Sequence, residues 1–418
     1  MKMIQRLLLF GLFVAILILV IAYARGYRLD VKKKSVTATG IIAVDSSPKT
    51  AKIYVNGELK GVTNMNLVLP PGKYTVEVKK DGYMDWKKNI SLKGELVMTL
   101  DATLFPQNAS LTPLTNLGVG KIISIDQTGR HILFSQTGTP EKDGIYIFDQ
   151  SKRPFSLFPP LKLLILKKNL PADIDLYETK VTFSPDYKEG IFEFMVGDQT
   201  TAYDMGFDEE VKTPFDVTTS QASLSQAWKE ERVREAVKIL EALPKDMRAI
   251  ASDSFHIVSF APDKTKFLYE VTKKEGLPPI IIPPLISANQ ETEERNLNPG
   301  DLYIYDIKED KNFKLNVKEE DFDPASGVGG DTQKKDVENW KMNVERYIVW
   351  YPDSQHVVLN EQKQTSIMEY DNSNKQVIYS GPHEQNFLDI ALDGKLLILA
   401  NLNPQTNKSP DVYAVGIR

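Results

Sequence analysis

The chain has 418 residues, of which 42% are hydrophobic and 26% charged, and it contains no cysteine. This length and composition are typical of two or three folded domains and argue against wholesale disorder, collagen and coiled coil. The lack of cysteine excludes disulfides, thiolate metal sites and cysteine nucleophiles. The formal net charge is −5 at pH 7. Because the acidic excess falls in residues 105–418, nucleic acid is an unfavourable partner.

Residues 7–24 form the first recognisable element, a mostly apolar run without a charge. As a helix rising about 1.5 Å per residue, the run spans about 27 Å, close to the hydrocarbon thickness of a bilayer. We predict an uncleaved membrane anchor that contacts lipid through this run. Ala22-Tyr23-Ala24 has the A-x-A form of a signal-peptidase site, so cleavage after Ala24 is the first alternative. A buried helix in a soluble protein is the second.

The charges around this run leave its orientation contested. Lys2 and Arg6 precede it, whereas Arg25, Arg28 and residues 32–34 follow it, and a count of flanking positive charge would keep the C-terminal bulk in the cytoplasm. Long domains translocate largely regardless of charge, and lysines can lie against anionic headgroups. We therefore expect a single-pass membrane protein with its bulk on the extracytoplasmic side, and we assign residues 1–34 to the anchor and juxtamembrane segment.

Residues 35–104 are predicted to form a small antiparallel β-sandwich. Apolar residues alternate along residues 51–55 and 73–78, as in strands with one buried face. Asn56-Gly57 follows the first of these runs and is a strong hairpin signal, because both turn positions need positive φ. Pro70-Pro71-Gly72 marks a further turn.

Residues 39–104 resemble the PEGA domain family. The motifs that carry the resemblance are, in chain order, Ser47-Pro48, residues 53–57, Gly61-Val62-Thr63, residues 69–74 and residues 80–83. The segment departs from the family pattern at Asn64, where the family usually has proline. The resemblance implies a surface-associated, non-catalytic module of bacterial and archaeal envelope proteins.

Residues 105–418 contain a degenerate repeat. A turn with an aspartate precedes an apolar strand five times, at Asp126, Asp186, Asp263, Asp353 and Asp393. A unit of about 40 residues with insertions is the period of a four-stranded propeller blade. The repeat resembles the WD40-like repeats of the TolB-type β-propeller, whose Ser-Pro-Asp-Gly signature is partly kept at residues 184–186 and 393–394. The chain is therefore predicted to be mainly β, with a propeller of about five to seven blades.

One insertion between the repeats is predicted to be helical, over residues 225–243. Val233, Ala236, Val237 and Leu240 fall at i, i+3, i+4 and i+7, and Pro244 follows. We expect this stripe to pack as core against a blade, with a partner site as the alternative.

Two further insertions lack helical periodicity. The proline-rich segment 277–285 cannot be a central strand, because its prolines lack ladder donors, so we expect an extended loop. A peptide-like docking segment is the alternative. Residues 321–340 form a polar, glycine-containing insertion.

The end of the chain predicts how the propeller closes. The last repeat offers three strands, over residues 387–391, 396–399 and 411–417, whereas a blade has four. We expect residues 109–116 to supply the fourth strand, because Pro113 is tolerated only at a sheet edge.

No catalytic, cofactor or metal motif is complete. His383-Glu384 begins H-E-x-x-H, but Phe387 replaces the second histidine. Residues 327–330 lack the spacing of a dinucleotide loop, and Asp321, Asp323 and Asp331 match no EF-hand. We therefore assign no catalytic, cofactor-binding or metal residue and expect no cofactor.

Two residue types of the repeat, histidine and aspartate, are instead expected to have structural roles. His131 and His356 occupy one repeat position, which indicates a shared structural role. The aspartates of the turns, among them Asp186 and Asp393, are expected to accept backbone N–H bonds.

Three function classes remain open. The first is a non-catalytic surface protein whose propeller binds a protein, peptide or glycan of the envelope, with the PEGA domain as a spacer. The second is an envelope enzyme that cleaves glycans with propeller carboxylates. The third is a structural subunit of a membrane complex.

Overall fold

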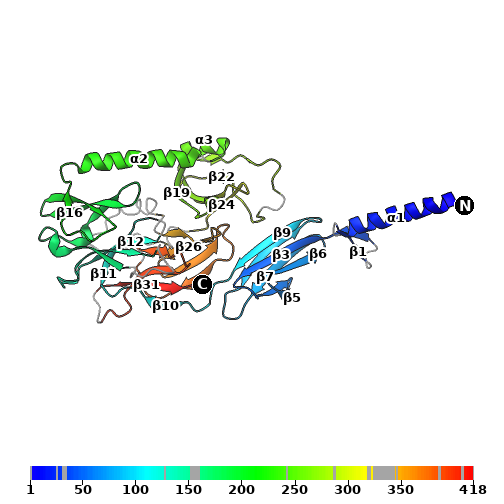
Figure 1. Ribbon diagram of the computed structural model, residues 1–418, viewed down its shortest axis with the longest axis horizontal. Helices are drawn as coiled ribbons and strands as arrows, with labels where there is room; N and C mark the ends of the chain where they lie inside the picture. The colour runs from blue at the N-terminus through cyan, green and yellow to red at the C-terminus, as the bar shows by residue number, and fades with distance from the viewer. Residues whose placement is uncertain are drawn as a thin grey trace. The chain divides into compact units, whose positions relative to one another are not determined.

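The computed structural model describes residues 2–24, 27–30, 35–126, 129–150, 161–241, 243–285, 289–317, 322, 344, 347–384, 387–405 and 409–417. The chain is mainly β and divides into two compact units (Figure 1). Unit 1 comprises residues 1–107 and 281–292, and unit 2 comprises residues 108–280 and 293–418. Unit 1 is therefore discontinuous in sequence.

Unit 1 begins with helix α1 (Lys2–Ala24), which contains the predicted apolar run. The window Ile4–Ile21 has a mean hydropathy of 2.7, and none of it is buried. By length and composition this helix can cross a membrane. A short hairpin of β1 (Tyr27–Asp30) and β2 (Ser35–Ala38) follows.

The rest of unit 1 is a sandwich of two sheets. One sheet has the order β6 (Met65–Leu69), β3 (Gly40–Ser47), β9 (Val97–Thr103), and the other β5 (Glu58–Val62), β4 (Lys52–Val55), β7 (Gly72–Lys79), β8 (Trp86–Leu92). Alternate residues such as Ile42, Ile53 and Val76 are fully buried between the sheets. The pairing differs from the expected antiparallel sandwich in one place. Because β9 crosses from the second sheet to the first, it pairs with β3 in parallel.

The predicted hairpin at Asn56-Gly57 is confirmed. It joins β4 to β5, and the two residues have φ values of 52° and 82°. The Asn56 side chain also accepts a hydrogen bond from the backbone N–H of Thr75 at 2.9 Å. An ideal Cβ on Gly57 would meet no heavy atom within 4 Å, so glycine serves the backbone conformation here and not close packing.

We predict that Gly57→Val destabilises unit 1 by about 1–3 kcal/mol, because a β-branched residue is strained at positive φ. Urea unfolding of residues 35–107 measures the change. Gly57→Asn is the matched control, since asparagine tolerates this conformation, and its midpoint should stay close to that of the original sequence. Equal midpoints for all three proteins would contradict the strain argument.

Unit 2 is a β-propeller, and its described residues form five blades, each a four-stranded antiparallel sheet. Blade 1 contains β11 (Val119–Ser124), β12 (Arg130–Ser135), β13 (Gly144–Asp149) and β14 (Leu161–Leu166). Blade 2 contains β15 (Lys180–Phe183), β16 (Glu189–Val196), β17 (Gln199–Gly206) and β18 (Phe215–Asp216). Blade 3 contains β19 (Phe255–Phe260), β20 (Lys266–Val271), β23 (Leu302–Asp306) and β24 (Lys311–Lys314). Blade 4 contains β25 (Ile348–Trp350), β26 (His356–Glu361), β27 (Gln364–Glu369) and β28 (Gln376–Tyr379). Blade 5 contains β29 (Leu388–Ile390), β30 (Leu396–Ala400), β31 (Asp411–Gly416) and β10 (Ser110–Pro113).

Neighbouring blades share buried apolar clusters. Phe134 of blade 1 and Phe192 of blade 2 belong to one cluster, and Phe148 of blade 1 shares another with Leu399 of blade 5. Both faces of the second strands are thus covered, so β30 is buried at every position. This explains why these strands read as continuous apolar runs in the sequence.

Blade 5 closes the ring with strands from both ends of the unit. Ser110 of β10 lies opposite Gly416 of β31, and Pro113 lies opposite Tyr413. The prediction that residues 109–116 complete the last blade is confirmed. β10 is the outermost strand of its sheet, where a proline without an N–H is tolerated.

A buried carboxylate fastens this closure. Oδ1 of Asp411 accepts hydrogen bonds from the Thr115 hydroxyl at 2.7 Å, from the Leu117 N–H at 2.9 Å and from the Gly118 N–H at 3.2 Å. The Thr115 hydroxyl in turn accepts the Val412 N–H at 3.0 Å. Asp411 is only 8% exposed, so its carboxyl oxygen depends on these donors in place of water.

We predict that Asp411→Ala destabilises the protein by about 2–3 kcal/mol, because charge-assisted hydrogen bonds are lost and two N–H groups remain without an acceptor. Thermal unfolding of the full chain measures the effect. Asp393→Ala, in an exposed turn of the same blade, should change stability by about 1 kcal/mol or less. Equal losses for the two variants would contradict a special role of Asp411.

Candidate functional site

Four of the five repeat aspartates have the predicted structural role. Oδ1 accepts the backbone N–H two residues further on at 3.2 Å in Asp186, 2.9 Å in Asp263, 2.8 Å in Asp353 and 3.2 Å in Asp393. The residue after each aspartate has positive φ: Tyr187, Lys264, Ser354 and Gly394. Asp126 differs, because its carboxylate accepts from the Arg130 guanidinium. These carboxylates build turns.

The two repeat histidines are both buried and both bonded to aspartate, but in different ways. Nε2 of His131 lies 2.6 Å from Oδ2 of Asp389, which joins blade 1 to blade 5. Nδ1 of His356 lies 2.7 Å from Oδ2 of Asp353 in its own turn. Burial acts to raise the pKa of Asp353, but bonding to His356 outweighs it and holds this pKa below its usual value.

The incomplete zinc motif has a local structural role as well. Nδ1 of His383 lies 3.0 Å from the Gly381 carbonyl, and Nε2 lies 3.1 Å from Oδ1 of Asn360. Within the described ranges, no three histidine or acidic residues are arranged to hold a metal ion. Residues 321, 323, 327–330 and 331 lie outside those ranges.

Blade 2 carries an acidic pair that sequence reasoning missed. Gly206 lies opposite Glu189 and Asp204 opposite Ile191, so the two carboxyls are diagonal neighbours on one face. Burial raises the pKa of both, and Asp204 adds to the effect on Glu189. Oδ1 of Asp204 is buried and has no hydrogen-bond partner among the described residues. The pairing register of β16 and β17 brings the two carboxyls together, and this register cannot be read directly from the sequence.

Two helices are inserted between blades 2 and 3: α2 (Gln221–Glu241) and α3 (Lys245–Ser254). Figure 1 shows them along the outside of β16 and β19. Trp228, only 7% exposed, packs α2 against Ile191 and Ala202 of blade 2. Arg232 donates a hydrogen bond to the Phe183 carbonyl at 2.9 Å.

The predicted helix is therefore present, but the expected orientation of its apolar stripe is wrong. Val233 and Val237 are 54% and 47% exposed, and of the stripe Leu240 is the residue seen to pack against the blade 3 core. The helical spacing identified an apolar stripe correctly. Trp228 and Arg232, on another side of the helix, decide which side faces the blade, and the stripe turns outward.

The outward side of α2 carries a shallow hollow of about 320 Å³. The residues that line it are Gln226, Lys229, Glu230, Val233 and Arg234. Val237 lies one turn beyond Val233 on the same side of the helix. We call this set the α2 outer face. It combines two exposed apolar side chains with a carboxylate, an amide and two cationic groups.

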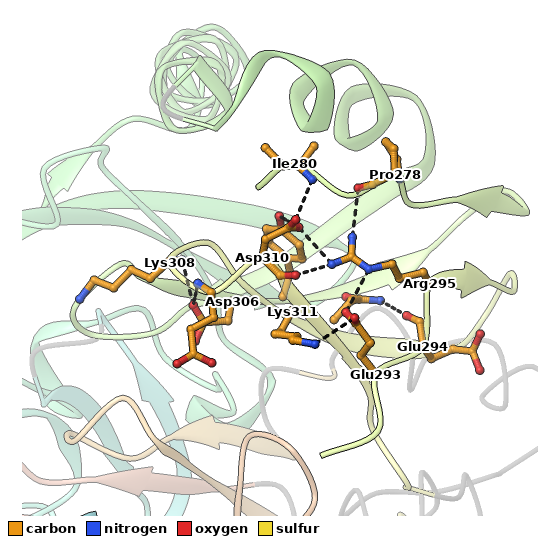
Figure 2. A network of polar contacts seen from close by, with 12 residues as sticks. Pro278, Ile280, Glu293, Glu294, Arg295, Asp306, Lys308, Asp310 and Lys311 are labelled. Atoms are coloured by element: carbon orange, nitrogen blue, oxygen red, sulfur yellow. Dashed lines mark hydrogen bonds and ion pairs between the residues drawn. The ribbon is translucent and has the colours of Figure 1, made fainter. Parts of the chain in front are cut away.

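The proline-rich segment lies in an insertion between β20 and β23 that contains β21 (Glu275–Gly276) and β22 (Asn296–Leu297). Figure 2 shows the network that holds the ends of this insertion. Arg295 donates to the Pro278 carbonyl at 3.0 Å and lies 3.2 Å from a carboxylate oxygen of Asp310. Asp310, 4% exposed, accepts the Ile280 N–H at 2.6 Å and the Tyr305 hydroxyl at 2.8 Å.

Apolar contacts complete this anchoring. Leu277 and Leu297 are buried in one cluster with Met247 of α3 and Tyr269 of β20. The segment is a loop, as expected. Sequence reasoning missed Arg295 and Asp310, because buried charges that pair across an insertion resemble ordinary surface charges in the sequence.

We predict that Asp310→Ala destabilises unit 2 by about 3–5 kcal/mol, because it removes the carboxylate that pairs with Arg295 and leaves the Ile280 N–H and the Tyr305 hydroxyl without their acceptor. Denaturant unfolding of the full chain measures the loss, and hydrogen exchange should show a faster Ile280 amide. Lys311→Met is the control. Its ammonium pairs with the half-buried Glu293 at 3.0 Å and should contribute about 1 kcal/mol or less. Similar losses for the two variants would contradict this account.

One comparison with known proteins identifies a family for part of the chain. Residues 39–108 match the model of the PEGA domain family. This part of the chain is a PEGA domain, as its motifs indicated. Among curated proteins, none matches the sequence of the chain.

Among solved structures, the similar chains are of low overall similarity. TolB from Acinetobacter baumannii is 11% identical, with a TM-score of 0.20; the match covers 83% of this chain and 61% of TolB. A putative TolB from Agrobacterium tumefaciens is 10% identical, with a TM-score of 0.19 and coverage of 88% and 98%. A quinoprotein alcohol dehydrogenase-like protein from Bacteroides thetaiotaomicron is 12% identical, with a TM-score of 0.25 and coverage of 88% and 90%.

Proposed function

We propose that the chain is a membrane-anchored, extracytoplasmic and non-catalytic surface protein. In this proposal, α1 holds the chain in the bilayer, the PEGA domain is a spacer, and the propeller is a platform that binds an envelope protein, peptide or glycan. The observation that carries the platform role is the exposure of Val233 and Val237 on a helix whose other side is fixed by Trp228. Apolar side chains held outward on a rigid element favour binding, because little conformational entropy remains to be lost.

Of the three ligand classes, a protein or peptide fits the α2 outer face best. Val233 lines its hollow together with Glu230 and Arg234. An apolar anchor residue of a partner can fill such a hollow, and the charges around it fix its register.

The non-catalytic part of the proposal is supported by the roles of the acidic repeat residues. The carboxylates of Asp186, Asp263, Asp353 and Asp393 are engaged in their own turns. The carboxylate of Asp411 accepts a hydrogen bond from Thr115 where β10 and β31 close the ring. Turn building and closure account for these acids without an enzymatic role.

The topology is tested by proteolysis. We predict that protease added to intact cells, or to spheroplasts where an outer membrane is present, digests residues 35–418. The N-terminal peptide should remain in the membrane fraction, because α1 is long enough to span the bilayer. Protection of the whole chain until lysis would reverse the orientation. A mature protein that begins at Arg25 would show cleavage after Ala24 instead.

The platform is tested by photo-crosslinking in intact cells. A benzophenone amino acid in place of Gln226 should form an adduct with a polypeptide partner. Val233→Asp combined with Val237→Asp should lower the yield about tenfold, since a desolvated apolar anchor contributes on the order of 1–2 kcal/mol. Val377→Asp is the control, because Val377 is 43% exposed on blade 4. Equal yields with both variants would exclude the α2 outer face as the binding site.

An envelope glycan-cleaving enzyme is the second candidate function, favoured by the acidic pair of blade 2. A carboxyl with a raised pKa can act as a general acid, and glycosidases pair such an acid with an ionised carboxylate on the other side of the bond. The binding proposal predicts that Glu189→Gln and Asp204→Asn leave the crosslinking yield unchanged. Release of reducing ends from envelope glycan by the original protein, and its loss in Glu189→Gln, would favour the enzyme.

A further inference from the structure

Residues 281–292 belong to unit 1, although 173 residues separate Gln107 from Ile281 and the residues on both sides of the segment belong to unit 2. Within unit 1, Gln290 of this segment bonds to Ser91 of β8. Oε1 of Gln290 accepts the Ser91 N–H at 2.6 Å. Nε2 of Gln290 donates to the Ser91 carbonyl at 3.1 Å.

These two bonds have the chemistry of strand pairing. A glutamine carboxamide presents one acceptor and one donor, as a peptide unit does. By binding both polar groups of one backbone residue, it reproduces the pair of bonds that two antiparallel residues exchange in a ladder. A carboxylate of the same shape can accept the N–H but has no hydrogen to donate to the carbonyl.

The position of Ser91 explains why it can be bound in this way. β8 is an edge strand of the four-stranded sheet of the PEGA domain, with β7 on its other side. Ser91 lies opposite Lys73 in the ladder between them. The N–H and C=O of Ser91 point away from β7, toward the side on which an added strand binds.

We propose that the β8 edge of the PEGA domain is a peptide-docking site, and that its occupant is this chain's own stretch around Gln290, residues 289–292. Gln290 is the specificity-determining residue, because its carboxamide satisfies both backbone groups of Ser91. The mode is β-strand addition, in which backbone groups of the edge give affinity and side chains give selectivity. This inference does not depend on the proposed function of the propeller.

The PEGA domain is suited to a test in trans. Its buried apolar cluster is drawn wholly from residues between Ile42 and Leu104, so residues 35–107 contain a complete core. The probe is a synthetic peptide of residues 277–296. Residues 35–107 should bind it saturably, with chemical-shift changes at Ser91. A peptide with Gln290→Glu should bind at least fivefold more weakly, because a carboxylate faces the Ser91 carbonyl.

The full chain supplies an independent measurement. In Gln290→Ala, the Ser91 amide should exchange with solvent at least tenfold faster, whereas the Ile90 amide, which lies in the ladder with Tyr74, should keep its rate. Gln226→Ala on α2 is the matched control and should change neither amide. The proposal requires both the weaker binding of the Gln290→Glu peptide and the faster exchange of the Ser91 amide in Gln290→Ala. An unchanged Ser91 rate in Gln290→Ala, or equal binding of the two peptides, overturns it.

Discussion

The propeller depends on the pairing of β10 with β31. Four residue pairs join the first strand of unit 2 to its last, and the hydrogen bonds of Asp411 secure the chain immediately beyond them. Without this pairing, blade 5 would have three strands and an open edge, which invites association with other chains. The joint also carries a large loop-closure entropy cost, because residues almost 300 positions apart must meet before any of its bonds can form.

A second joint strengthens the same place. His131 on β12 and Asp389 on β29 connect blades 1 and 5 through a buried bond, and Phe387 packs edge-on against the imidazole ring at 5.4 Å between centroids. Nδ1 of His131 has no partner among the described residues. Donation from Nε2 to Asp389 suits these surroundings, because a hydrogen on Nδ1 would be buried without an acceptor.

The features that the sequence predicted are those governed by local chemistry. Asn56-Gly57 needs positive φ wherever it occurs, and an aspartate that accepts the N–H two residues later makes the same turn in every blade. The edge position of β10 was predictable because Pro113 excludes a central one. The features that escaped prediction depend on partners distant in sequence. The burial of Asp310 requires Arg295, the parallel register of β9 requires β3, and Trp228 determines which side of α2 is exposed.

The connection between the two units has a mechanical consequence. β9 ends at Thr103 and β10 begins at Ser110, so residues 104–109 are one covalent path from the PEGA domain into the propeller. Two further crossings flank residues 281–292 and lead into the insertion of blade 3. Tension applied through residues 104–109 reaches unit 2 first at β10. The first hydrogen bonds to carry that load are those between β10 and β31. A pull through residues 104–109 is therefore directed at the strand that closes the ring, and the ladder of blade 5 is the first element of unit 2 to bear it.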